Sequence, residues 1–312
     1  MPALLNVAVI VAAFAALAWS ADRFVRASAG LARRLGMSPL LVGLVIIGFG
    51  TSAPEILVSA LAAVAGNTGL AVGNALGSNI ANVGLVLTLT AIMFPLTVGR
   101  SASLRELRAL LAATLLVPLL LLDGVAGRVD GALLLLGLVI ALIWLIRTGD
   151  PDSAQTATGL PTSRSLPHTL AWITGSLALL LVSARVLVWA AVELATAAGV
   201  SDLVIGLSVV AAGTSLPELA TALAAARLRQ HALVLGNILG SNLFNLLGVL
   251  GIAAFLQPAV LTPEVLYRDY LLMALMTLGL AVLVTRMGGM GRGMAVGILA
   301  LYSGYLVLLF SI

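Results

Sequence analysis

The chain has 312 residues, of which 61% are hydrophobic and 9% are charged. Soluble globular proteins carry about 25% charged residues, so this composition excludes an ordinary soluble protein and indicates an integral membrane protein. The formal net charge of +4 arises from 16 basic residues, all of them arginine, and the lack of cysteine excludes disulfides and thiolate metal sites. In a membrane chain we interpret these arginines as marks of the cytoplasmic side rather than as a nucleic-acid surface.

Ten windows of about 20 apolar residues predict ten transmembrane helices and hence an all-α integral membrane protein. The first window has no basic leading region and no cleavage site of small residues, so we expect a retained helix there. In chain order the predicted spans cover residues 3–21, 38–63, 70–95, 104–122, 130–147, 169–192, 202–226, 232–256, 267–285 and 293–311.

The arginines fall unevenly between alternate loops, which predicts the orientation of the spans. One side holds only Arg128, Arg185 and Arg268. By the positive-inside bias the opposite side is cytoplasmic, so both termini are expected on the extracytoplasmic side of the cell (plasma) membrane. The arginines of the expected cytoplasmic side are Arg23, Arg26, Arg33, Arg34, Arg100, Arg105, Arg108, Arg147, Arg164, Arg227, Arg229, Arg286 and Arg292.

An internal repeat organises the chain. Residues 38–82 align without a gap on residues 201–245, at an offset of 163, with 19 identities in 45 positions. We therefore expect two five-helix halves, residues 1–147 and 168–312, joined by a short cytoplasmic linker at 148–167, which together form one transport domain. Because five is odd, the second half enters the membrane from the opposite side, and the repeats are inverted.

The repeat contains a motif that reads GTSAPE at residues 50–55 and GTSLPE at residues 213–218. Ser52 and Ser215 are expected to cap a helix, because a glutamate follows each at the spacing of a capping box. The proline before each glutamate removes a hydrogen bond from the preceding turn, so we expect spans 2 and 7 to be broken there. A single motif of this kind is equally well explained as a kink with an internal cap.

Two carboxylates at one depth favour a cation site over a pair of kinks. An acidic side chain at the centre of a transmembrane helix costs about 2.5–3.5 kcal/mol. Glutamine could cap the helix without this cost, so capping alone does not explain the two glutamates. The inverted repeat brings Glu55 and Glu218 to equivalent depths, where hard cations would find oxygen ligands. The breaks are expected to leave main-chain carbonyl groups without full helical partners at Gly48, Thr51, Ala211 and Thr214.

A second pair of stretches adds oxygen atoms. GNALGSNIAN at residues 73–82 matches GNILGSNLFN at residues 236–245. Its glycines, Gly73 and Gly77 with Gly236 and Gly240, form the small-xxx-small pattern of close helix packing. Its polar residues, Ser78 and Asn82 with Ser241 and Asn245, are expected to turn hydroxyl and amide oxygens toward the carboxylates. Asn79 and Asn242 are expected either to join them or to hold unwound backbone.

Both motif pairs resemble the two α-repeats of the cation/calcium exchanger superfamily, and in particular the prokaryotic sodium/calcium exchangers. The resemblance implies an antiporter that binds calcium between Glu55 and Glu218 with the carbonyl oxygens of Thr51 and Thr214. It implies that sodium shares those carboxylates and adds Ser78, Ser241 and backbone oxygens near Gly48 and Ala211. The full candidate set for the cations is Gly48, Thr51, Ser52, Glu55, Ser78, Asn82, Ala211, Thr214, Ser215, Glu218, Ser241 and Asn245.

At position 245 this chain differs from some exchangers of the family. Those exchangers, including potassium-dependent ones, carry aspartate where this chain has Asn245. The candidate site thus has two carboxylates rather than three, which argues against potassium co-transport. Two alternatives to sodium/calcium antiport stay open: calcium/proton antiport on the same scaffold, and a cation channel. A channel is disfavoured, because two carboxylates at the midplane favour tight occupancy over conduction.

The expected partners follow from this interpretation. They are Ca2+ and Na+, or H+, as transported ions, together with the lipid bilayer. We expect no nucleic acid, no enzymatic cofactor and no obligatory protein partner. No enzyme is predicted, because the sequence offers no nucleophile beside a base, no zinc-ligand cluster and no nucleotide-binding loop.

Overall fold

The computed structural model describes residues 3–97, 104–148, 165–199 and 211–311, and these residues are almost entirely helical. Seven of the described helices are long and apolar enough to cross a membrane, or eight if a bent pair counts as one span. The prediction of an all-α membrane protein is confirmed. The count of ten spans stays a prediction, because α7 has 17 residues and part of the predicted span 202–226 lies outside the described residues.

The elements follow the predicted spans in order. Segments of π-helix, labelled η, interrupt several of the α-helices or adjoin their ends. The first half contains α1 (Ala3–Leu35), α2 (Pro39–Val42), η1 (Gly43–Gly48), α3 (Phe49–Thr51), α4 (Ala53–Val64), α5 (Thr68–Ala81), η2 (Asn82–Leu87), α6 (Thr88–Met93), β1 (Leu96–Thr97), α7 (Leu104–Leu120), β2 (Val125–Ala126) and α8 (Arg128–Arg147). The second contains α9 (Leu166–Ala197), α11 (Ala211–Thr214), α12 (Leu216–Arg227), α13 (His231–Leu243), η5 (Phe244–Val249), α14 (Leu250–Leu256), β3 (Ala259–Val260), η6 (Val265–Tyr270), α15 (Leu271–Val282), η7 (Leu283–Met287), β4 (Gly289–Met290) and α16 (Arg292–Ser311).

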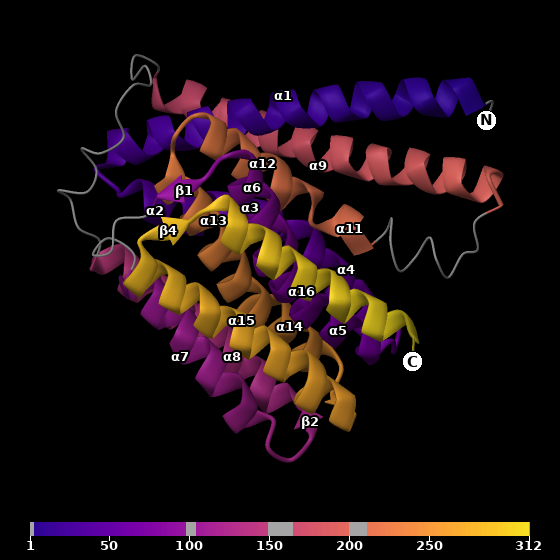
Figure 1. Cartoon of the computed structure of the whole chain (residues 1–312). Coiled ribbons are helices and arrows are strands. Elements are labelled where there is room, and N and C mark those ends of the chain that lie inside the picture. The colour runs from indigo at the N-terminus through magenta and orange to yellow at the C-terminus, as the bar shows by residue number, and fades with distance from the viewer. Residues whose placement is uncertain (1–2, 98–103, 149–164, 200–210, 312) are drawn as a thin grey trace.

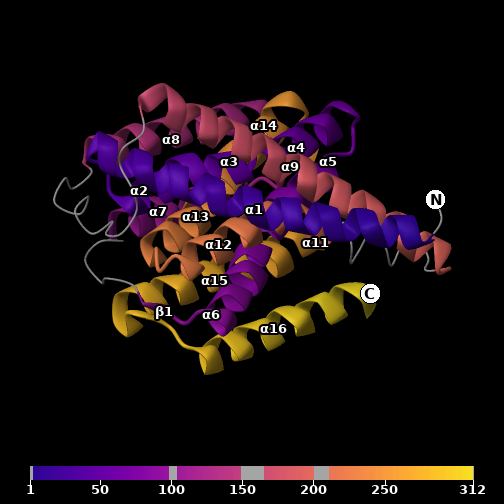
Figure 2. The ribbon, with the colours of Figure 1, turned by 90° about the horizontal axis from the view of Figure 1, so that it is seen from above.

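The helices form two groups. In Figures 1 and 2 the long helices α1 and α9 run side by side and antiparallel, and the remaining helices form a tilted bundle against one side of them. Both long helices exceed the predicted spans, since α1 continues past residue 21 until Gly36. Gly36 ends it with a positive φ of 63° and a hydrogen bond from Met37 N to Ala32 O, the C-terminal cap that glycine favours.

The bundle is built around four site-bearing segments. The α4 and α5 helices pack together in the first half, as α12 and α13 do in the second, and α13 packs against η1 across the two halves. Glycine permits that close approach, because a Cβ on Gly236 or Gly240 would overlap the carbonyl oxygens of Leu40 or Leu44. The predicted packing role is thus confirmed for these two glycines. An added Cβ at Gly73 or Gly77 meets no described atom within 4 Å.

Two short antiparallel ribbons join the halves. The β1 strand pairs with β4, with Leu96 opposite Met290, and β2 pairs with β3, with Val125 opposite Val260. Figure 1 shows β1 and β4 at one end of the tilted helices and β2 at the other. Each ribbon contains one strand from each half. The β1 and β3 strands begin 163 residues apart, at equivalent positions of the two halves.

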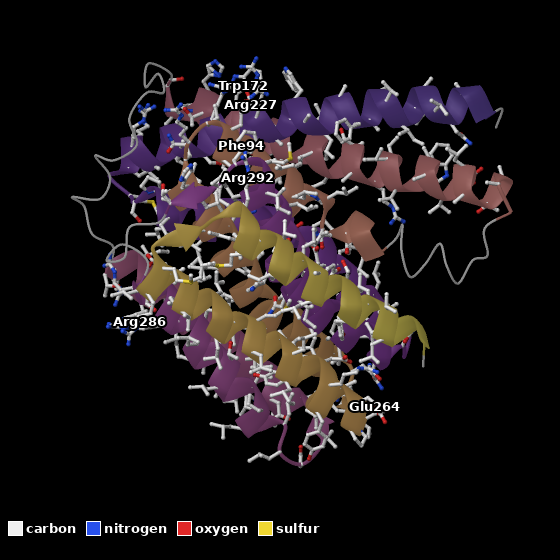
Figure 3. The ribbon with its side chains drawn as sticks, viewed as in Figure 1. Phe94, Trp172, Arg227, Glu264, Arg286 and Arg292 are labelled. Carbon is white, nitrogen blue, oxygen red and sulfur yellow. The ribbon has the colours of Figure 1, made fainter. Side chains whose placement is uncertain are left out.

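Three of the arginines expected on the cytoplasmic side lie toward one end of the tilted helices. Figure 3 shows Arg227, Arg286 and Arg292 at one end of the tilted helices and Glu264 at the other. The remaining surface of the described helices is largely apolar, with large exposed side chains such as Phe14 at 62% and Leu115 at 69%. A surface of this kind matches a hydrocarbon environment rather than water.

Candidate cation site

Each repeated motif interrupts a helix immediately before its glutamate. The helix pair Pro39–Thr51 and Ala53–Val64 is bent by 43°, with Ser52 between them at φ −80° and ψ 0°. In the second half α11 ends at Thr214 and α12 begins at Leu216, with Ser215 at φ −88° and ψ 3°. Pro54 contributes to the first break, because it has no N–H to donate to the carbonyl group of Gly50.

Two local predictions about these breaks are wrong. Neither Ser52 nor Ser215 makes a side-chain capping bond, because the flanking residues stay near helical geometry and the chain bends without opening a cap. The Ser52 hydroxyl is instead buried without a partner. The Gly48 carbonyl group is not free either, since it accepts a hydrogen bond from Ser52 N at 3.0 Å. The Thr51 and Ser241 hydroxyls also donate to this oxygen, at 3.4 and 3.5 Å.

Glu55 and Glu218 are both 1% exposed, and each has one carboxyl oxygen, Oε2, with no hydrogen-bond partner. They lie close enough for the charge of Glu55 to act on Glu218, which also has the Thr51 hydroxyl nearby. A buried carboxylate without a partner is costly, so these oxygens mark a place where a cation would be stabilised.

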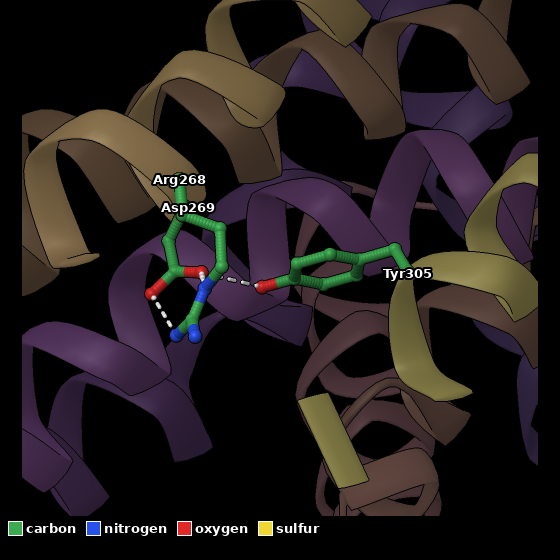
Figure 4. A network of polar contacts seen from close by, with 3 residues as sticks. All are labelled: Arg268, Asp269 and Tyr305. Atoms are coloured by element: carbon green, nitrogen blue, oxygen red, sulfur yellow. Dashed lines mark hydrogen bonds and ion pairs between the residues drawn. The ribbon is translucent and has the colours of Figure 1, made fainter. Parts of the chain in front are cut away.

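The carboxylate of Asp269 contrasts with the two glutamates, because all of its partners are side chains of the same protein. Asp269 accepts hydrogen bonds from Arg268 Nε at 2.7 Å and Nη2 at 3.1 Å, and from the Tyr305 hydroxyl at 2.9 Å. Figure 4 shows the three side chains joined in this network. Glu106 has an unpartnered Oε2 as well, but it lies in the first turn of α7, where the helix dipole favours negative charge.

The two halves cross at the glutamates. The π-helical segment η2, which begins at Asn82, packs against α12, and η5, which contains Asn245, packs against α4. Each asparagine therefore lies on a segment beside the helix that carries the other half's glutamate. Both amide atoms of Asn245 and the amide oxygen of Asn82 are buried without partners. Such π-helical segments often occur at functional sites.

Thr51 and Ser241 also meet across the halves. Their hydroxyl groups lie 3.3 Å apart, and each lies near the Gly48 carbonyl oxygen, at 3.4 Å from Thr51 and 3.5 Å from Ser241. Ser78 is 6% exposed on α5, at the position equivalent to Ser241. The equivalent of Gly48 is Ala211, whose backbone begins α11.

Asn79 and Asn242 connect helices rather than unwound backbone. Asn79 Nδ2 donates to the Asn242 carbonyl oxygen at 3.2 Å, and Asn82 Nδ2 donates to Asn242 Oδ1 at 3.0 Å. These bonds join α5 and η2 to α13 and leave the amide oxygen of Asn82 without a partner. Asn242 is therefore a structural bridge within the site.

Sequence reasoning missed one pair of residues. Asn74 Nδ2 donates to the Glu55 carbonyl oxygen at 3.1 Å and to Ser59 Oγ at 2.9 Å. Asn237 Nδ2 does the same in the other half, to the Glu218 carbonyl oxygen at 3.3 Å and to Thr221 Oγ1 at 3.2 Å. The signal was present, because both asparagines belong to the repeated GN dipeptide and lie 163 residues apart.

The donor set is that of a hard-cation site. Among the described residues no group of three or more His, Cys, Asp or Glu side chains could hold a metal. The gathered groups are two carboxylates with amide, hydroxyl and main-chain oxygens, which suit calcium or sodium better than a transition metal.

Comparison with known proteins places this geometry in a family. The family model described as "Sodium/calcium exchanger protein" matches residues 5–147 and 168–311. The putative antiporter CaxA of Alkalimonas amylolytica is 42% identical over 95% of each chain. The sodium/calcium exchanger MaX1 of Methanosarcina acetivorans is 26% identical over 93% of this chain and 94% of its own.

A solved structure agrees with both. The sodium-calcium exchanger NCX_Mj, soaked with 2.5 mM Na+ and 0.1 mM Ca2+, superposes with a TM-score of 0.82 at 33% identity, over 97% of this chain and 98% of its own. Family and fold are those of a transporter, which confirms the prediction that the chain is not an enzyme. The chain belongs to the sodium/calcium exchanger family of membrane antiporters.

Proposed function

We propose that this antiporter exchanges Ca2+ for Na+ by alternating access, with both ions bound between Glu55 and Glu218. The observation that carries the proposal is the pair of buried glutamates, each with an unpartnered oxygen, at the crossing of the two repeated motifs. Family members named for sodium/calcium exchange, MaX1 and NCX_Mj, support the choice of ions.

The proposed ligands divide by charge. Glu55 and Glu218 supply two negative charges, which balance one Ca2+. Neutral oxygens complete the shell, and calcium takes about six to eight oxygens in all. They come from the carbonyl groups of Gly48, Thr51, Ala211 and Thr214 and from the side chains of Ser52, Ser78, Asn82, Ser215, Ser241 and Asn245.

Exchange rather than one-way transport follows from the cost of the empty site. Two unneutralised carboxylates within a membrane are expensive, so the site changes sides readily only when cations occupy it. Calcium and sodium compete for the same oxygens, and each return step therefore carries the other ion. A higher sodium concentration inside would then drive calcium inward, and a higher sodium concentration outside would drive calcium outward.

The proposed architecture has ten transmembrane helices in two inverted halves, residues 1–147 and 168–312, with a cytoplasmic linker at 148–167. The offset of 163 between β1 and β3 and the one-strand-per-half ribbons support the inversion. The arginines gathered at one end support a cytoplasmic side there, with both termini outside the plasma membrane. In this scheme α1 and α9 rock against the bundle that holds the site.

Reconstituted vesicles test the choice of counter-ion. Calcium-45 uptake is measured under an outward sodium gradient, under a pH gradient without sodium, and under neither, with the membrane potential clamped by valinomycin and potassium. We expect uptake only with the sodium gradient. Uptake that follows the pH gradient and ignores sodium would identify a calcium/proton antiporter and overturn the proposal.

Two controls make the result specific. Vesicles that contain the Glu55→Gln, Glu218→Gln double variant should show no driven uptake under any gradient. Calcium flux that needs no counter-ion at all would contradict exchange and indicate a channel.

A further inference from the structure

An open groove lies between α1 and α9, and none of its lining residues belongs to the candidate cation set. It has a volume of about 390 Å³, and it is lined by Trp19, His168, Ala171, Trp172, Gly175 and Ser176. Trp19 is 47% exposed, so the groove opens on the surface of helices that face lipid. No described backbone or side-chain atom lies within 4 Å of a Cβ added at Gly175.

An uncompensated cation stands beside this groove. The Arg23 guanidinium lies 5.5 Å from the centre of the Trp19 ring and 5.9 Å from that of Trp172, so both indoles hold it. Asp22 is the adjacent acid, but it pairs with Arg26 at 2.7 Å. No described carboxylate forms an ion pair with Arg23, and its buried Nε has no hydrogen-bond partner.

The groups are ordered along the axes of α1 and α9. Because α1 and α9 are antiparallel, Arg23 lies one turn beyond Trp19 toward the arginine-rich end, and His168 lies one turn before Trp172 toward the same end. The two indole rings lie beside each other, with centres 6.1 Å apart. Gly175 is one turn farther from that end. The charge of Arg23, the two indole rings and the open space at Gly175 thus follow one another along the helices, starting from the arginine-rich end.

This order matches one kind of molecule. A phospholipid presents a phosphate at the interface, a glycerol backbone at the level of the aromatic belt, and acyl chains below it. We infer that the groove binds one anionic phospholipid, with its phosphate at Arg23 and an acyl chain along Gly175. Since α1 and α9 are the helices proposed to move, the lipid occupies a surface that changes during transport.

The test compares two groove variants with a matched control. Arg23→Gln removes the charge, Gly175→Leu fills the floor, and Gly304→Leu places the same side chain on α16, where an added Cβ also meets no described atom. Each protein is purified, shown to be monodisperse, and equilibrated with equal dioleoyl-phosphatidylglycerol and dioleoyl-phosphatidylcholine. Native mass spectrometry then counts retained lipids.

We expect wild type and Gly304→Leu to retain one phosphatidylglycerol, at least about tenfold in preference to phosphatidylcholine. Arg23→Gln should lose the preference, and Gly175→Leu should lose the bound lipid. Equal retention by all four proteins would overturn the inference. Displacement of the lipid by inorganic phosphate alone would also overturn it, because the site would then recognise a soluble anion.

A second readout keeps the inference testable if Arg23→Gln does not fold. In a background with Trp144→Phe and Trp189→Phe, only Trp19 and Trp172 fluoresce, since the chain has 4 tryptophans. Brominated phosphatidylglycerol should quench this emission more strongly than brominated phosphatidylcholine. Gly175→Leu should remove the difference, and a difference that persists in Gly175→Leu would contradict the site.

Discussion

The two spans that carry the asparagine motifs and the α1–α9 pair are built differently. In the most apolar 18 residues of Thr68–Met93 and of His231–Leu256, 72% and 89% are buried, against 28% in α1 and 22% in α9. The bundle packs backbone against backbone at Gly43 and Gly236, whereas the long pair packs through side chains such as Trp19 and Trp172. The difference separates a close-packed body that holds the candidate ligands from a more exposed pair, as the proposed rocking of α1 and α9 requires.

The largest effect should come from the charges inside the bundle. Glu55→Gln or Glu218→Gln removes half of the negative charge that balances calcium, and the loss of one partner from a buried ionic contact costs about 2–5 kcal/mol. We expect each variant to lower calcium transport at least about 100-fold. Calcium-45 uptake in vesicles measures this.

The same variants should stay folded, because a neutral amide is cheaper to bury than a carboxylate. Thermal unfolding in detergent without calcium provides the control, and a midpoint equal to that of wild type or higher is expected. Normal calcium transport in both single variants would refute the site.

Packing distinguishes the two regions next. Gly240→Ala places a methyl group against the Leu44 backbone, so we expect it to lower the free energy of unfolding by about 1–3 kcal/mol. Gly30→Ala on α1 meets no described atom and should be neutral or slightly stabilising. Thermal midpoints of the two variants in the same detergent provide the comparison. Equal midpoints would show that the bundle is not close-packed at Gly240.

Asn237→Ala tests whether the bundle positions its ligands. It removes the amide that holds the Glu218 carbonyl group and Thr221, at a cost of about 1–1.5 kcal/mol. We expect the KM for calcium to rise about tenfold with a smaller change in the maximal rate. Asn67→Ala, which removes an exposed helix cap bond to Leu70 N, is the matched control. The positioning role is excluded if both variants change KM alike.

Asn245→Asp should have the smallest effect. Both amide atoms of Asn245 lack partners, so the change breaks no hydrogen bond while it adds a third carboxyl group. We expect the protein to fold normally and the ratio of sodium to calcium affinity to change a few-fold, by about 1 kcal/mol. Competition of sodium against calcium-45 uptake measures the ratio. An unchanged ratio would mean that Asn245 does not face the ions.

Sequence alone predicted the all-helical membrane fold, for physical reasons. Hydropathy determines where a chain can cross lipid, and each of the ten predicted spans coincides at least in part with described helix. The offset of 163 pointed to both glutamates and to Asn82 with Asn245, whose segments pack across the two halves. Hydropathy does not determine where a helix stops once it leaves the membrane, so α1 is longer than predicted.

Local chemistry was harder to predict than global symmetry. The sequence pattern around Ser52 fits a capping box, yet the bend keeps near-helical backbone geometry there and the hydroxyl remains unpartnered. The bridge from Asn79 and Asn82 to Asn242 depends on how α5 and α13 meet in space. No pattern in a single sequence specifies that contact, although the repeat relates Asn79 to Asn242.

The two ribbons also have a consequence for biosynthesis. Leu96 and Val125 emerge from the ribosome long before their partners, Met290 and Val260. Neither strand of the first half can pair until most of the second half has been synthesised, and contacts between such distant residues form slowly. During co-translational insertion β1 and β2 therefore stay unpaired until β4 and β3 have been synthesised. Formation of the ribbons is then a late step that connects the two halves at both ends of the bundle.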